Sequence, residues 1–188
     1  IESLTIAPQF ASSFGVDPSD GLLTFQSINL SEVVIDGVEI SSEVDLSNLL
    51  GLQSRGILLK GALAYASGEN KTNSLPLNSV EPLTGVLGVS YYSGTGKWGS
   101  DIVWTLVKGK KEGDIDPSDS RSSTSGYGTL DLLVSYKFTE KVNLNFGIFN
   151  LTNKDYIRWA DTVAIGADAA GRFSQPPLNA SVTIRAEI

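Results

Sequence analysis

Residues 129–148 read TLDLLVSYKFTEKVNLNFGI, and apolar and polar side chains alternate on both sides of the central Thr-Glu-Lys. Successive side chains of an extended strand point to opposite faces of a sheet, so this period of two predicts strands with one apolar face. The stretch therefore predicts two antiparallel strands joined by a short turn at 139–141. The apolar face would carry Leu130, Leu132, Val134, Tyr136, Phe138, Val142, Leu144, Phe146 and Ile148.

The same alternation recurs along the chain and predicts seven strands in all. The last of them runs without a break in the pattern from Leu178 to Ile188. Two of the runs have a second face of small or mixed residues in place of charged ones, but their length and spacing still indicate strands. The five further runs are 33–46, 57–66, 83–92, 98–107 and 178–188.

The connections between these strands are alternately short and long. The short turns are 49–56, 93–97 and 139–141, and the long connections are 68–82, 108–126 and 157–177. Antiparallel strands joined in sequence reverse direction each time, so all long connections are expected at one end of the sheet and all short turns at the other. Loops this long without periodicity of their own are typical of functional or disordered segments.

Strand length and aromatic placement indicate what covers the apolar face. The runs are about 10 residues long, which is the length that a tilted strand needs to cross a bilayer, whereas strands of a β-sandwich average about 5–6. Charged residues on the opposite faces suit a water-filled lumen better than a protein core. The sequence therefore predicts an all-β, antiparallel transmembrane β-barrel. Aromatic residues gather near the strand ends, as at the headgroup levels of such barrels: Tyr65, Tyr91, Tyr92, Trp98, Tyr127, Tyr136, Phe138 and Tyr156.

Composition excludes several functions for the 188 residues. The chain has no Cys, no His and no Met, so it can form no disulfide, no Ser-His-Asp triad and no imidazole or thiolate metal site. It has 21 acidic and 14 basic residues, and this net charge of −7 argues against a nucleic-acid partner. No apolar run approaches the roughly 20 residues of a membrane-spanning helix. We therefore expect no enzyme and no cofactor, although carboxylate-only or Ser-Lys chemistry stays open.

Two features indicate a part of a larger protein. The chain starts at Ile1 without an initiator Met or the regions of a signal peptide, which predicts a processed product or a fragment. Seven strands are an odd number, whereas bacterial single-chain barrels have an even number, so further strands from the same polypeptide or another chain are expected.

Several motifs resemble the C-terminal strands of TonB-dependent outer-membrane receptors. Tyr127-Gly-Thr-Leu-Asp-Leu is one, and the run from Leu144 through Asn150-Leu-Thr-Asn-Lys-Asp-Tyr156 to Trp159 is the more specific one. Three other stretches resemble the heme and hemoglobin receptor branch of this family. They are Pro76-Leu-Asn-Ser-Val-Glu-Pro82-Leu83, the pairs Trp98-Gly, Trp104-Thr and Lys110-Lys111, and Phe25-Gln-Ser-Ile-Asn29-Leu with Gly37-Val-Glu39.

This resemblance implies that residues 1–188 are the C-terminal part of a roughly 22-stranded barrel with short periplasmic turns and long extracellular loops. The plug domain and earlier strands would lie elsewhere. It implies a multi-pass protein in the outer membrane of a Gram-negative bacterium that binds and imports an iron-containing ligand, namely heme or the heme of a heme protein. The TonB–ExbB–ExbD complex would supply energy through the plug. Because this segment has no histidine, histidine ligands to heme iron would have to come from outside it.

The candidate ligand contacts lie in two of the long loops, because Arg and aromatic side chains dominate binding hot spots. A solvated loop or an aromatic belt is the alternative for each of them. Asp114, Asp116 and Asp119 have nearly the spacing of a calcium loop but lack its Gly and terminal Glu, so no metal site is expected. The candidates are Arg121 and Tyr127 in one loop and Arg158, Trp159, Arg172 and Phe173 in the other.

Three other functions stay open at this point. A siderophore, vitamin B12 or glycan receptor would have the same architecture, and a heme difference spectrum would separate it from a heme receptor. An outer-membrane enzyme would require paired carboxylates about 5–9.5 Å apart. A soluble β-sandwich binding module would bury the apolar faces against each other.

Overall fold

The computed structural model describes residues 4–5, 22–23, 32–47, 49–52, 56–118, 121–162 and 173–187. The chain divides into two units, Ile1–Glu32 and Val33–Ile188. In the first unit, β1 (Leu4–Thr5) pairs with β2 (Leu22–Leu23) in antiparallel fashion. None of the helices that the structure describes is long and apolar enough to span a membrane.

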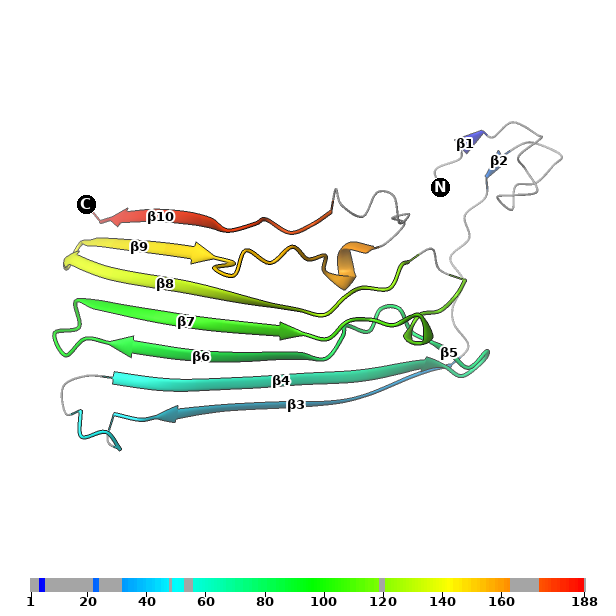
Figure 1. The fold of residues 1–188 in the computed structure, drawn as a ribbon, viewed down its shortest axis with the longest axis horizontal. Coiled ribbons are helices and arrows are strands. Elements are labelled where there is room, and N and C mark those ends of the chain that lie inside the picture. Colours follow the sequence, from blue (N-terminus) through cyan, green and yellow to red (C-terminus); the bar gives the residue numbers. More distant parts are fainter. Residues whose placement is uncertain are drawn as a thin grey trace. The chain divides into compact units, whose positions relative to one another are not determined.

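The second unit is a single antiparallel sheet, drawn as one layer of long strands in Figure 1. The order across it is β10-β9-β8-β7-β6-β4-β3, and the short β5 pairs with the end of β4. The all-β antiparallel prediction and the seven long strands are thus confirmed. The strands are β3 (Val33–Asp45), β4 (Gly56–Asn70), β5 (Leu75–Pro76), β6 (Thr84–Tyr92), β7 (Trp98–Val107), β8 (Tyr127–Thr139), β9 (Val142–Phe149) and β10 (Asn179–Ala186).

The largest difference from a predicted strand boundary is at β4, which runs four residues beyond the expected end at residue 66. Glu69 and Asn70 pair with Pro76 and Leu75 of β5, and Asn70 also pairs with Val33 of β3. The polar residues after Ala66 hide this extension from an alternation pattern. The first residues of the predicted 68–82 loop are therefore strand, and the true connection is shorter. The last connection, by contrast, is longer than the predicted 157–177, because β9 ends at Phe149 and β10 begins at Asn179.

The strand register aligns the apolar side chains of neighbouring strands into rows. One row joins Val89, Ile102, Leu132 and Ile148 across four strands. Another row joins Leu87, Trp104 and Leu130. The two rows lie on the same face of the sheet, because within each strand their residues are two positions apart. The sheet thus presents one continuous apolar face.

Within the part of the chain that the structure describes, no second layer of protein covers that apolar face. Val89, Ile102 and Trp104 are 44%, 47% and 46% exposed, although they lie at the centre of the sheet. The buried hydrophobic side chains among the described residues are Val80, Ile115 and Trp159, and all three lie in connections outside the strands. The β-sandwich alternative is therefore wrong, because a sandwich would bury these rows against a second sheet.

The opposite face carries small and polar side chains. The hydroxyl of Ser90 on β6 donates a hydrogen bond to the carboxylate of Asp101 on β7. Lys60 on β4 forms an ion pair with Glu43 on β3 at 3.7 Å. Ser90 is 2% exposed and Thr129 is 7% exposed, so this face is more enclosed than the apolar one. A wall that curves toward a polar lumen has this asymmetry.

The two ends of the sheet differ as the alternating connections predicted. The short turns lie at the end that also holds the C-terminus, and the long connections lie at the other end (Figure 1). On the apolar face, aromatic side chains gather at the short-turn end. The rings of Tyr91 and Trp98 meet edge to face at 5.4 Å, and those of Tyr136 and Phe138 do so at 5.4 Å, while Trp98 is the direct partner of Tyr136.

Candidate functional site

Asn150 is the first residue after β9, at the end of the sheet that carries the long connections, and it makes several polar contacts there. Asn150 is 4% exposed and has φ of +53°, a left-handed conformation that Asn tolerates better than most residues. Its side-chain amide donates to the carbonyls of Lys154 (2.9 Å) and Pro176 (3.2 Å), and its side-chain oxygen accepts the Lys154 N–H (2.9 Å). These bonds tie the start of the 150–178 connection to its end.

A second group of contacts is centred on Asn78, which lies between β5 and β6. The backbone carbonyl of Asn78 accepts hydrogen bonds from the indole N–H of Trp159 (2.8 Å) and from Nη1 of Arg121 (3.1 Å). Its side-chain oxygen accepts the backbone N–H of Asp116 (2.9 Å). Residues from three separate connections therefore meet at Asn78.

Two cations lie near the face of the Trp159 ring. The ammonium of Lys110 is 5.4 Å from the ring centroid, and the guanidinium carbon of Arg121 is 5.0 Å from it. Both are within the distance at which a cation is attracted by an aromatic ring. Burial lowers the pKa of Lys110 from its ordinary value, and the nearby Asp114 and Glu81 carboxylates partly oppose that effect.

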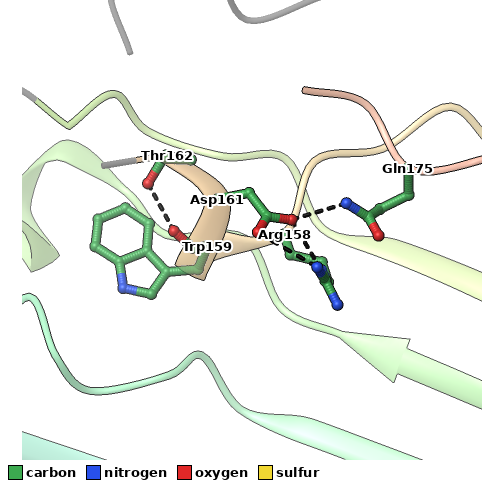
Figure 2. A network of polar contacts seen from close by, with 5 residues as sticks. All are labelled: Arg158, Trp159, Asp161, Thr162 and Gln175. Carbon is green, nitrogen blue, oxygen red and sulfur yellow. Dashed lines mark hydrogen bonds and ion pairs between the residues drawn. The ribbon is translucent and has the colours of Figure 1, made fainter. Parts of the chain in front are cut away.

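Arg158 belongs to a surface network beside this cluster (Figure 2). Its Nε donates to Oδ2 of Asp161 at 2.8 Å and its Nη2 to Oδ1 at 3.3 Å, in a two-pronged contact. The side-chain amide of Gln175 donates to the same Oδ2 at 2.7 Å, and the Thr162 hydroxyl donates to the Trp159 carbonyl. The hydrogen bond with Asp161 raises the pKa of Arg158, so Arg158 keeps its charge while its side chain is 56% exposed.

A hollow of about 340 Å³ opens between the β7–β8 connection and the β9–β10 connection. Tyr156 is one wall, and its ring stacks on that of Tyr127 with centroids 4.1 Å apart. Burial raises the pKa of Tyr156, so its hydroxyl stays protonated at neutral pH. The rest of the wall is rich in hydroxyl groups, contributed by Ser122, Ser123, Thr124, Ser125, Thr162 and Ser174.

The structure brings the sequence-predicted site residues together in pairs and leaves some apart. Arg121 meets Trp159, which is 2% exposed, and Tyr127 meets Tyr156. Arg158 pairs with Asp161, whereas Phe173 is 45% exposed. Arg172 lies outside the described residues.

Sequence reasoning missed four residues of this arrangement: Asn78, Lys110, Asp161 and Gln175. Asn78 and Lys110 lie in stretches noted for their resemblance to a receptor family, but no pattern in the sequence joins them to Trp159. Asp161 and Gln175 are ordinary polar loop residues by sequence. Asn78 and its partner Trp159 are 81 positions apart, so only the fold shows this contact.

No group of three or more acidic side chains in the described part of the chain could hold a metal ion. Asp116 accepts hydrogen bonds from the N–H and hydroxyl of Ser118, and Asp114 accepts from the N–H of Lys111. Asp119, the third residue of the calcium-like spacing, lies outside the described residues.

Comparison with known proteins identifies the family. The family described as TonB dependent receptor-like, beta-barrel matches residues 6–151. The chain belongs to this TonB-dependent receptor family. Among its relatives, hemoglobin-haptoglobin-binding protein A of Haemophilus influenzae is 31% identical over an alignment of 146 residues that covers 72% of this chain and 14% of that protein. Lactoferrin-binding protein A of Neisseria meningitidis serogroup B is 26% identical over an alignment of 179 residues that covers 83% of this chain and 19% of that protein.

A solved transporter structure has the same fold. The copper transporter OprC superposes on 83% of this chain and 24% of its own chain, with a TM-score of 0.69 and 21% identity. The resemblance expected from residues 127–159 is therefore confirmed, and the predicted barrel wall is confirmed with it. The chain spans about a seventh of the length of the H. influenzae relative.

Proposed function

We propose that residues 1–188 form the C-terminal part of the barrel of a TonB-dependent receptor in a Gram-negative outer membrane. The apolar face of the sheet, which no described residue covers, is the observation that carries this proposal. β7 has 10 residues, and at about 3.3 Å per residue and a tilt of about 45° it rises roughly 23 Å. This height fits the apolar band of about 25 Å in such barrels, so lipid tails would cover the face and the aromatic group at Tyr91 and Trp98 would lie at the periplasmic headgroups.

The whole receptor would import an iron-containing ligand, most simply heme or the heme of a heme protein. The names of relatives support this, since they include hemoglobin-, haptoglobin- and lactoferrin-binding proteins. This chain has no His, so any imidazole ligand to iron would come from the rest of the receptor. The relatives are named as binding proteins, which supports a role in binding and import without catalysis.

Within this chain, the ligand would meet the extracellular connections. Arg158 and Phe173 offer an exposed charge and an exposed ring, and Arg172 lies next to Phe173 in sequence. Tyr127 and Tyr156 would form an aromatic wall beside the hydroxyl-lined hollow. Arg121 and Trp159 contact each other and would hold these surfaces in place without contacting the ligand themselves. The TonB–ExbB–ExbD complex would drive import through a plug supplied by the rest of the polypeptide.

The proposal is tested with the intact receptor and two readouts. Cells that lack it should lose growth on hemin or hemoglobin as sole iron source, and the loss should be reproduced by deleting TonB. The purified receptor should shift the Soret band of hemin. Normal growth of the deletion strain on both iron sources together with an unchanged Soret band would contradict the heme proposal and favour a siderophore, vitamin B12 or glycan ligand on the same barrel.

A further inference from the structure

Among the described residues, each of the three long connections contains one buried hydrophobic residue. Val80 comes from the connection between β5 and β6, Ile115 from that between β7 and β8, and Trp159 from that between β9 and β10. Their exposures are 6%, 7% and 2%, whereas the large hydrophobic residues of the strands lie open on the apolar face. A single buried hydrophobic residue is too small a core to order a connection of this length by itself.

Hydrogen bonds at Asn78 cross between the same three connections. Trp159 donates to its carbonyl from 81 positions away, Arg121 from 43 positions and Asp116 to its side chain from 38 positions. In the sheet, β9 is separated from β6 by β8 and β7. The 150–178 connection therefore reaches past the ends of two strands to make its contact with Asn78.

The face of the Trp159 ring contacts the β7–β8 connection as well. Arg121 and Lys110 both approach this ring, and both belong to the β7–β8 connection. Arg121 also donates to Asn78, so it contacts a residue of each of the other two connections. Removal of the indole would leave the Asn78 carbonyl without one donor and Arg121 without its ring contact.

We propose that the described parts of these three connections, residues 77–83, 108–118, 121–126 and 150–162, form one cooperative unit of the extracellular mouth, which unfolds as a whole, and that Trp159 is the positioning residue that unites it. Segments that share their buried contacts unfold together, because loss of one removes the partners of the others. A ligand that orders one connection would therefore also order the other two. The inference concerns the mouth itself and does not depend on which ligand the receptor imports.

Hydrogen exchange on the intact receptor tests this coupling through a distant reporter. The Asp116 N–H donates its hydrogen bond to Asn78 and not to Trp159. Its exchange rate therefore reports on the contact between the β5–β6 and β7–β8 connections, and not directly on the indole. In Trp159→Ala, we expect exchange about tenfold faster or more in 112–118 and in 76–82 as well as in 156–162. Trp159→Phe keeps a ring against the cations and removes the N–H donor, and it should accelerate the same three segments by a smaller factor.

Trp98→Phe is the matched control, because Trp98 lies on β7 at the short-turn end of the sheet. It should leave all three segments unchanged. Arg121→Gln gives the reciprocal test and should accelerate exchange in 156–162, and it also decides the question if Trp159→Ala does not assemble in the membrane. Acceleration confined to 156–162 in the Trp159 variants, or absent from 156–162 in Arg121→Gln, would overturn the proposal and show that the connections move independently.

Discussion

The side-chain amide of Asn150 donates a hydrogen bond to the backbone carbonyl of Pro176, 26 positions further along the chain, at 3.2 Å. The Asn150 N–H also donates to the Asp131 carboxylate on β8 at 2.8 Å. This residue opens the Asn-Leu-Thr-Asn-Lys stretch that is similar to the family motif. The motif thus has a structural reason: it fixes where the chain leaves β9 and where it returns to β10.

Asn150→Asp should destabilise the receptor by about 1–3 kcal/mol, the usual cost of buried polar groups that lose their partners. The variant keeps the shape and the left-handed tolerance of Asn but loses both amide donors, and it adds a carboxylate close to Asp131. Thermal unfolding in detergent, read by the heat-dependent shift in gel mobility, measures the change. Asn145→Asp makes the same chemical change at an exposed position of β9, and equal unfolding temperatures for the two variants would contradict this role for Asn150.

Gly68→Ala tests how the segment after β5 packs onto β4. A Cβ at Gly68 would lie 2.7 Å from Cγ2 of Val80 and 2.9 Å from Cδ1 of Leu77, which is closer than carbon atoms approach. The Leu77–Val80 segment must therefore move away, and we expect a loss of about 1–3 kcal/mol, typical of overpacking. Limited proteolysis between 77 and 82 should become faster.

Gly61→Ala is the control for Gly68→Ala on the same strand. A Cβ at Gly61 would lie 3.6 Å from Cδ2 of Leu87, an ordinary contact. This variant should keep the wild-type unfolding temperature and proteolysis rate. If both alanine variants behaved alike, the close packing over Gly68 would not be what holds the segment.

The sequence was informative where one physical rule acts on every residue in turn. Leu130 to Phe138 alternate because one face meets apolar surroundings and the other does not, and this is visible without any knowledge of the partners of those residues. The end of β4 at Asn70 was missed because its pairing with Leu75 and Val33 is a property of backbone register. The Asn78–Trp159 contact was missed because it joins residues 81 positions apart through a backbone carbonyl, which every residue type has.

Lys110 provides a prediction on pH dependence. Its pKa is lowered by burial, so acylation of its amine, followed by mass spectrometry of the intact receptor, should show a titration midpoint below 10.5. Between that midpoint and 10.5 the unfolded state binds this proton more strongly than the folded state does. The free energy of unfolding of the mouth should therefore rise with pH through this window.

Charge substitutions around Lys110 should move that midpoint in opposite directions. Asp114→Asn removes a carboxylate that favours the ammonium, so the pKa should fall further. Arg121→Gln removes a like charge and should raise the pKa toward its ordinary value. Midpoints that shift in the same direction in both variants would contradict the charge arrangement around Lys110.

The two faces of β7 give the sharpest test of the membrane assignment, because Ile102 and Val103 are neighbours of similar size that point to opposite sides. Ile102 is 47% exposed on the apolar face between Val89 and Leu132, and Val103 lies on the polar face between Gly88 and Asp131. Ile102→Arg should cost about 2–4 kcal/mol of folding free energy in liposomes, because it places a charge among lipid tails near the middle of the band. Val103→Arg places the same charge beside a carboxylate in the lumen and should cost much less. If Ile102→Arg assembled in the outer membrane as well as Val103→Arg does, lipid could not be what covers the apolar face, since hydrocarbon offers a guanidinium neither water nor a partner.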